Sequence, residues 1–65
     1  MITHIEFKDC LGNKYIHPID CMMLETLYTV EDETEDVITY KINNYEVYES
    51  EFDRVKNILI KRGNL

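Results

Sequence analysis

The sequence predicts an α+β fold, an antiparallel meander of four to five strands packed on one C-terminal helix. Three observations predict it. Apolar and polar residues alternate along several short segments, Asn43-Asn44 separates two of these segments, and the chain after Ser50 has amphipathic helical spacing. With 65 residues, of which 45% are hydrophobic, the chain forms one small domain, residues 1–65. Such a domain buries only about 60% of the surface of its unfolded chain.

The first part of the chain predicts a hairpin. Ile2–Lys8 alternates between apolar and polar residues, which indicates a half-buried strand. Gly12-Asn13 favours a turn because both residues tolerate positive φ. Lys14–His17 is rich in β-branched and aromatic residues, which favours a second strand, and Pro18 ends that strand or places it at a sheet edge.

The segment Ile19–Val30 fits two patterns. Its apolar residues fit a helical stripe that Asp20 could cap, and they also fit a strand. The β-branched and aromatic content of Leu27–Val30 favours the strand. We therefore expect one helical turn near Ile19–Met22 and then a strand that ends at about Val30.

An acidic loop, Glu31–Asp36, leads into a second predicted hairpin. Asparagine tolerates the positive φ of a two-residue type I′ turn, so Asn43-Asn44 fixes the register. The expected pairs are Ile42 with Tyr45, Lys41 with Glu46, Tyr40 with Val47, Thr39 with Tyr48, and Ile38 with Glu49. This register gathers apolar residues on one face, which supports it.

The chain ends in a predicted helix. Ser50 is a good N-cap residue, and Asp53 three residues later resembles a capping box. Acidic residues then occupy the first turn and basic residues the last turn, as the helix dipole favours. Gly63 suits the C′ position. The apolar stripe comprises Phe52, Val55, Ile58 and Leu59.

The C-terminal half resembles the FlbD-type small flagellar proteins. The resemblance rests on a hairpin of the form V-I-T…Y-x-V-x-E-S before a closing helix, and the matching positions are Val37, Ile38, Thr39, Tyr45, Val47, Glu49 and Ser50. This chain has Asn43-Asn44 where that family turns on Asn-Gly. The resemblance implies the same β-then-α architecture and an accessory role in a larger assembly.

The charge of the chain is strongly negative and unevenly placed. The net charge is −6 and the pI about 4.7; residues 1–50 hold eleven acidic and three basic residues, whereas residues 51–65 hold two acidic and four basic ones. Such a surface argues against direct binding to nucleic acid or to an anionic membrane. Because no apolar run has the length of a signal peptide or a membrane span, we expect a cytoplasmic protein whose Cys10 and Cys21 are reduced.

No motif predicts catalysis, a metal site or a cofactor. A nucleophile, a base and an orienting group must meet in space, and only His17 and Cys21 are close along the chain. The spacing of His4, Cys10, His17 and Cys21 matches no zinc pattern, so a metal or redox module remains a minor alternative. The acidic loop lacks the central glycine of a calcium-binding EF-hand.

The sequence therefore favours a small acidic non-enzymatic binding protein. We expect it to bind a basic surface on a nucleic-acid-handling protein as a stoichiometric inhibitor or nucleic-acid mimic, of the phage anti-defence or anti-CRISPR type. The alternative is a structural or regulatory subunit, such as a flagellar-type accessory protein, and a homodimer fits either function. The predicted partner-binding residues are Glu25, Glu31, Asp32, Glu33, Glu35, Asp36 and Tyr48.

Overall fold

A computed structural model describes residues 3–30 and 36–63 and confirms the α+β fold. Its elements are β1 (His4–Lys8), β2 (Lys14–Pro18), a short 3-10 helix η1 (Ile19–Cys21), β3 (Leu24–Val30), β4 (Asp36–Ile42), β5 (Tyr45–Val47) and α1 (Glu49–Lys61). The meander divides into two antiparallel sheets, β1-β2 and β3-β4-β5. The backbone N–H of Cys10 donates to the carbonyl oxygen of Glu46 at 2.9 Å, which joins the two sheets.

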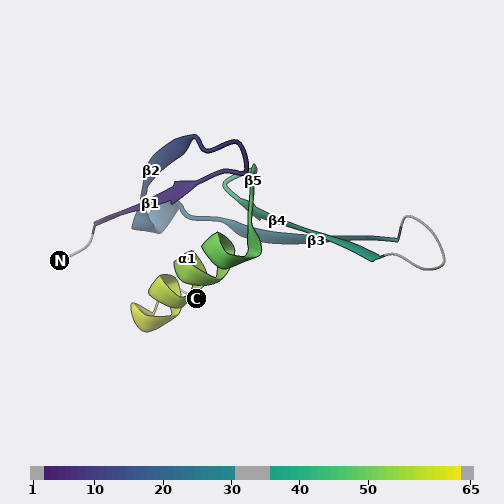
Figure 1. Cartoon of the computed structure of the whole chain (residues 1–65). Helices are drawn as coiled ribbons and strands as arrows, with labels where there is room; N and C mark the ends of the chain where they lie inside the picture. Colours follow the sequence, from purple (N-terminus) through teal and green to yellow (C-terminus); the bar gives the residue numbers. More distant parts are fainter. Residues whose placement is uncertain (1–2, 31–35, 64–65) are drawn as a thin grey trace.

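The core lies where α1 meets both sheets. Figure 1 shows α1 against the strands at one end of the molecule, while β3 and β4 continue beyond the helix. The predicted helical stripe is confirmed, with Ile58 partly buried. The buried apolar residues come from β1, β4, β5 and α1, and they are Ile5, Phe7, Ile42, Val47, Phe52, Val55 and Leu59.

Most of the predicted elements are present. The first hairpin forms, and β2 ends at Pro18 as the sequence predicted. In Ile19–Val30 the structure has one helical turn followed by a strand, so the helix alternative is wrong. Gly63 has φ 76° and its N–H donates to the carbonyl oxygen of Ile60, which confirms that Gly63 follows the end of the helix at the C′ position.

The second hairpin confirms the turn but corrects its far end. Asn43 and Asn44 have φ of 50° and 71°, and the three pairs nearest the turn are those predicted. The expected pairing of Thr39 with Tyr48 and of Ile38 with Glu49 is wrong, because β5 ends at Val47. Tyr48 is the N-cap of α1 and no side chain makes a cap hydrogen bond, so Ser50 lies inside the first turn and does not cap the helix.

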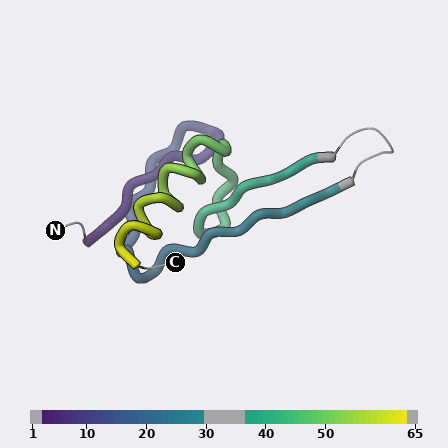
Figure 2. Tube along the Cα trace, turned by 90° about the horizontal axis from the view of Figure 1, so that it is seen from below, coloured from purple at the N-terminus to yellow at the C-terminus, as the bar shows by residue number. Residues whose placement is uncertain are grey.

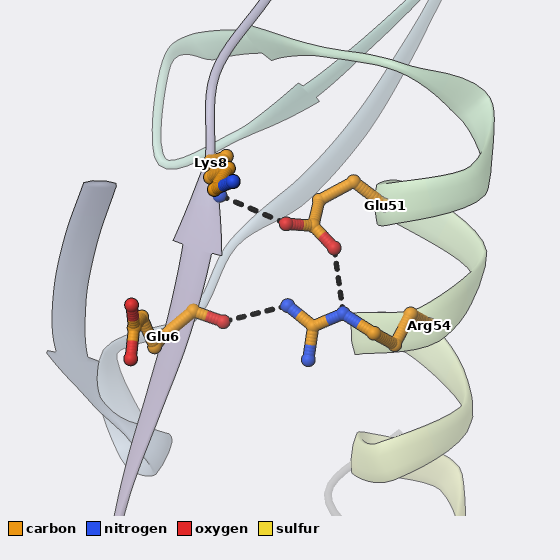
Figure 3. Close-up of polar contacts among 4 residues, drawn as sticks. All are labelled: Glu6, Lys8, Glu51 and Arg54. Carbon is orange, nitrogen blue, oxygen red and sulfur yellow. Dashed lines mark hydrogen bonds and ion pairs between the residues drawn. The ribbon is translucent and has the colours of Figure 1, made fainter. Parts of the chain in front are cut away.

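Two side chains from the first turns of α1 reach the edge of β1 (Figure 3). The N–H of Lys8 donates to Glu51 Oε2 at 2.9 Å, and Arg54 Nη2 donates to the carbonyl oxygen of Glu6 at 2.7 Å. Arg54 Nε also donates to Glu51 Oε1 at 2.6 Å, so the two side chains form an ion pair. This Glu51–Arg54 clamp satisfies backbone groups on the edge of β1 that does not face β2.

Candidate protein-binding surface

Strands β3 and β4 form a two-stranded arm that projects away from the helix (Figure 2). Tyr28 pairs with Ile38, so these two side chains share one face of the arm, whereas Leu27 and Val37 share the other. All four are exposed. Because a two-stranded hairpin with exposed apolar residues is only marginally stable alone, the arm has the character of an interaction surface.

Tyr48 lies at the base of this arm, between β5 and α1. Its extended backbone, φ −73° and ψ 153°, joins the strand to the helix, and its side chain is 64% exposed. The Tyr48 hydroxyl donates a long hydrogen bond of 3.5 Å to the carbonyl oxygen of Cys10. The ring is thus held against the first hairpin while remaining accessible.

The Tyr48 side chain stands between two shallow hollows. One, of about 330 Å³, lies beside β4 and is lined by Ile38, Glu46 and Glu49 among others. The other, of about 450 Å³, lies beside the β1–β2 turn and includes Leu11 and Glu51. We call Leu11, Ile38, Glu46, Tyr48 and Glu49 the Tyr48 surface.

Leu11 is 86% exposed because the β1–β2 turn holds it outward. The buried carboxylate of Asp9 accepts hydrogen bonds from the N–H groups of Leu11 and Asn13 and from the Tyr15 hydroxyl, each at 2.9 Å. Gly12 supplies the positive φ of 86° that this turn requires. Burial raises the pKa of Asp9, but the hydrogen bonds from Asn13, Tyr15 and Leu11 outweigh burial and leave this pKa below its ordinary value. The turn is therefore built around an ionised aspartate, and an ordered backbone presents Leu11.

Carboxylates dominate the electrostatics of the Tyr48 surface. Burial and the neighbouring charges of Glu46 and Asp9 raise the pKa of the Cys10 thiol. On the other side, burial and the charges of Glu49 and Asp53 raise the pKa of the Tyr40 hydroxyl. Burial is the larger cause of both shifts, and the neighbouring carboxylates add to it with a negative potential that suits a positively charged partner.

The predicted partner-binding residues occupy the arm and its base where the structure describes them. Glu25 lies on β3 directly opposite Lys41, which in turn lies opposite Glu46. Asp36 begins β4, opposite Val30. Tyr48 lies among carboxylates, as the sequence predicted, although it caps the helix and is not part of a strand. The remaining predicted residues, Glu31, Asp32, Glu33 and Glu35, fall outside the described residues.

Sequence reasoning did not assign Leu11, Ile38 or Glu49 to the Tyr48 surface. Glu49 was expected at the end of a strand, yet it is the first residue of α1 and lines the hollow beside Tyr48. Leu11 and Ile38 were not singled out. The sequence did offer a signal for Leu11. It is a large apolar residue inside a turn sequence, Asp9 to Asn13, and such a residue is exposed because a turn has no core to face.

The residues considered for catalysis and metal binding do not form one site. His4 pairs with Pro18 and His17 with Ile5, so the two histidines point to opposite faces of the first hairpin. Within residues 3–30 and 36–63, no group of three or more His, Cys, Asp or Glu side chains is placed to hold a metal ion. Cys10 and Cys21 are free thiols, and the raised pKa of Cys10 keeps it protonated and weakly nucleophilic.

Comparison with known proteins gives no family for this chain. No protein-family model, curated protein or solved structure shows significant similarity to it. The resemblance to the FlbD-type proteins stays a prediction. Across the described residues, no helix has both the length and the apolar character needed to cross a membrane.

Proposed function

We propose that this chain is a non-enzymatic protein that binds a basic protein partner stoichiometrically through the Tyr48 surface. The observation that carries the proposal is Tyr48 itself, 64% exposed between two hollows whose linings include Glu46, Glu49 and Glu51. A tyrosine offers a rigid apolar ring and a polar tip, and such residues often dominate binding energies at interfaces. The surrounding carboxylates would select partners that present lysine and arginine.

We further propose that the partner handles nucleic acid and that the protein acts as an inhibitor or nucleic-acid mimic, of the phage anti-defence or anti-CRISPR type. A net charge of −6 on 65 residues supports this proposal, because carboxylates can occupy positions where a basic groove otherwise receives phosphates. The acidic segment Glu31–Asp36, which follows β3 in the sequence and ends at the first residue of β4, contributes five of the acidic residues. A mimic of this kind competes with nucleic acid for its partner.

Affinity capture tests the proposal. The immobilised protein is expected to retain a basic protein from a host-cell extract at low ionic strength and to release it at high ionic strength. Tyr48→Ala is expected to weaken capture by at least about tenfold, the cost of losing a central aromatic residue. A Glu46→Gln, Glu49→Gln double variant is expected to weaken capture and to reduce its salt dependence.

Ile60→Ala is the matched control, since Ile60 is an exposed apolar residue of α1 that lines neither hollow beside Tyr48. This variant is expected to capture as well as the wild type. Capture that is insensitive to salt and unchanged by both surface variants would contradict the proposal. Added duplex DNA is expected to displace the partner, and a partner that DNA leaves bound would contradict the mimic.

The apolar residues of the arm favour a second candidate function, a structural or regulatory subunit of a larger assembly. In that case the partner contacts Leu27, Tyr28, Val37 or Ile38 and tolerates changes of charge. Charge reversal across Glu31–Asp36 separates the two functions. The reversal is expected to abolish binding by an acidic inhibitor and to spare assembly of an apolar subunit.

A further inference from the structure

The outer edge of β3 differs from the edges of β1 and β2. The edge of β1 is covered by the Glu51–Arg54 clamp, and β2 ends in Pro18, which has no N–H to offer. β3 is the outer strand of its sheet, runs for seven residues, contains no proline and carries a single charge, Glu25. Within residues 3–30 and 36–63 this edge has no such protection, and a long unprotected edge is a template for another strand.

We propose that a second copy of this chain pairs antiparallel with β3, with the two-fold axis at Leu27. The hydrogen-bond pattern of the sheet permits this register. The N–H of Asn43 donates to the carbonyl oxygen of Met23, so the backbone groups of alternate residues from Met23 onward point to β4. The backbone groups of Thr26 and Tyr28 consequently point outward, and an axis at Leu27 pairs Thr26 with Tyr28 of the second copy.

The side chains of β3 complement themselves in this register. Leu27 meets Leu27 of the second copy as a close pair without hydrogen bonds, and Leu27 is 41% exposed in the single chain. Thr26 opposite Tyr28 is a favourable β-branched and aromatic pair. Glu25 lies opposite Thr29, so no like charges face each other across the new pair of strands.

Charge also favours a second copy in the antiparallel direction. The far end of each arm lies at Val30 and Asp36, and the chain between them is acidic by sequence. Antiparallel pairing sets these two ends at opposite ends of the dimer, whereas parallel pairing brings them side by side. The two three-stranded sheets, β3-β4-β5 of each copy, then form one six-stranded sheet, and each two-stranded arm gains the support of further strands.

The dimer leaves the Tyr48 surface open. In the sheet order β3-β4-β5, the new strand joins beside β3, while Tyr48 follows β5 at the opposite edge. Self-association and capture of a basic partner are therefore independent, and failure of one is distinguishable from failure of the other.

Cross-linking tests the register. In a Cys10→Ser, Cys21→Ser background, Leu27→Cys is expected to form a disulfide-linked dimer under mild oxidation, because opposed residues without hydrogen bonds approach closely. Thr29→Cys, on the same face of the same strand, lies opposite Glu25 in this register and is the matched control. Rapid cross-linking of the first variant alone supports the proposal, and equal rates for the two variants overturn it.

Sedimentation of the native sequence supplies a measurement that needs no cysteine replacement. The protein is expected to show a concentration-dependent monomer–dimer equilibrium. Leu27→Lys places two like charges opposite each other and is expected to raise the dimer Kd by at least about tenfold. Ile60→Lys, an equally drastic change at an exposed residue of α1, is expected to leave the Kd unchanged. A wild-type chain that stays monomeric at all concentrations, or a Kd that both variants raise alike, overturns the proposal.

Discussion

Arg54→Ala removes half of the Glu51–Arg54 clamp and is expected to destabilise the whole domain. The variant loses the hydrogen bond to the carbonyl oxygen of Glu6 and the ion pair with Glu51 (Figure 3). It also leaves the edge of β1 without its covering side chain. The Glu51 carboxylate keeps only the N–H of Lys8.

The expected cost follows from the exposure of these groups. The side chains of Arg54 and Glu51 are 48% and 20% exposed, so the ion pair contributes about 0.2–1 kcal/mol. The hydrogen bond to Glu6 adds about 0.5–1.5 kcal/mol. Together they give about 1–2 kcal/mol, against a total stability of roughly 3–10 kcal/mol for a domain of this size. The Tm should fall by about 5–15 °C.

Urea denaturation followed by circular dichroism measures this loss. A double-mutant cycle with Glu51→Ala is expected to give a coupling energy of about 0.5–1 kcal/mol, because the two side chains act together. Lys56→Ala, on the exposed side of the same helix, is the control and should change stability by less than about 0.5 kcal/mol. The reasoning is refuted if Arg54→Ala and Lys56→Ala are equally stable.

Three further predictions concern the core, the second hairpin turn and the pH dependence of stability. Leu59→Ala should cost about 2–5 kcal/mol in urea denaturation because Leu59 is buried, whereas Ile60→Ala should cost little. Asn43→Ala should destabilise the protein by about 1–2 kcal/mol, because the Asn43 side-chain oxygen accepts a hydrogen bond from the Met23 N–H. Asn44→Gly should be neutral or stabilising, because Asn44 has φ 71° and glycine adopts positive φ without strain. Thermal melts of the two variants test this difference. The hydrogen bond from Arg54 lowers the pKa of Glu51; burial opposes this shift and the Lys8 N–H adds to it. Hydrogen bonds outweigh burial and likewise lower the pKa of Asp9. The two carboxylates therefore stabilise the fold above their ordinary pKa values of 4.5 and 3.8, and this stabilisation is lost as the pH falls through their lower pKa values in the folded protein. Acid titration followed by circular dichroism should show a smaller loss for Asp9→Asn than for the wild type, and an unchanged acid transition would contradict this assignment.

Local sequence signals were sufficient to predict most of the fold. The Asn43-Asn44 pair predicted the turn, and both residues have the positive φ that this turn needs. Alternation in β1 identified Ile5 and Phe7 as core residues. The error at Tyr48 arose because Tyr48 and Glu49 continue an alternating pattern that fits a strand equally well. Only the packing of α1 against β1 and β4 decides that the helix begins at Glu49.

The candidate site was less predictable than the fold because it depends on contacts distant in sequence. The first hairpin reaches the helix start through the Cys10–Glu46 hydrogen bond and the Tyr48–Cys10 contact, and no local pattern encodes either. The clamp likewise joins Lys8 to Glu51 across 43 positions of the chain. The alternation of the second hairpin did predict that Tyr48 lies beside carboxylates, because that pattern is local in the sequence.

The affinity of the protein for its captured partner, measured across ionic strength for the wild type and for Tyr48→Ala, tests the central claim most directly. We expect a Kd that rises steeply with salt, a weaker complex for Tyr48→Ala at every salt concentration, and displacement by duplex DNA. A Kd that is independent of salt and identical for the two proteins would contradict it.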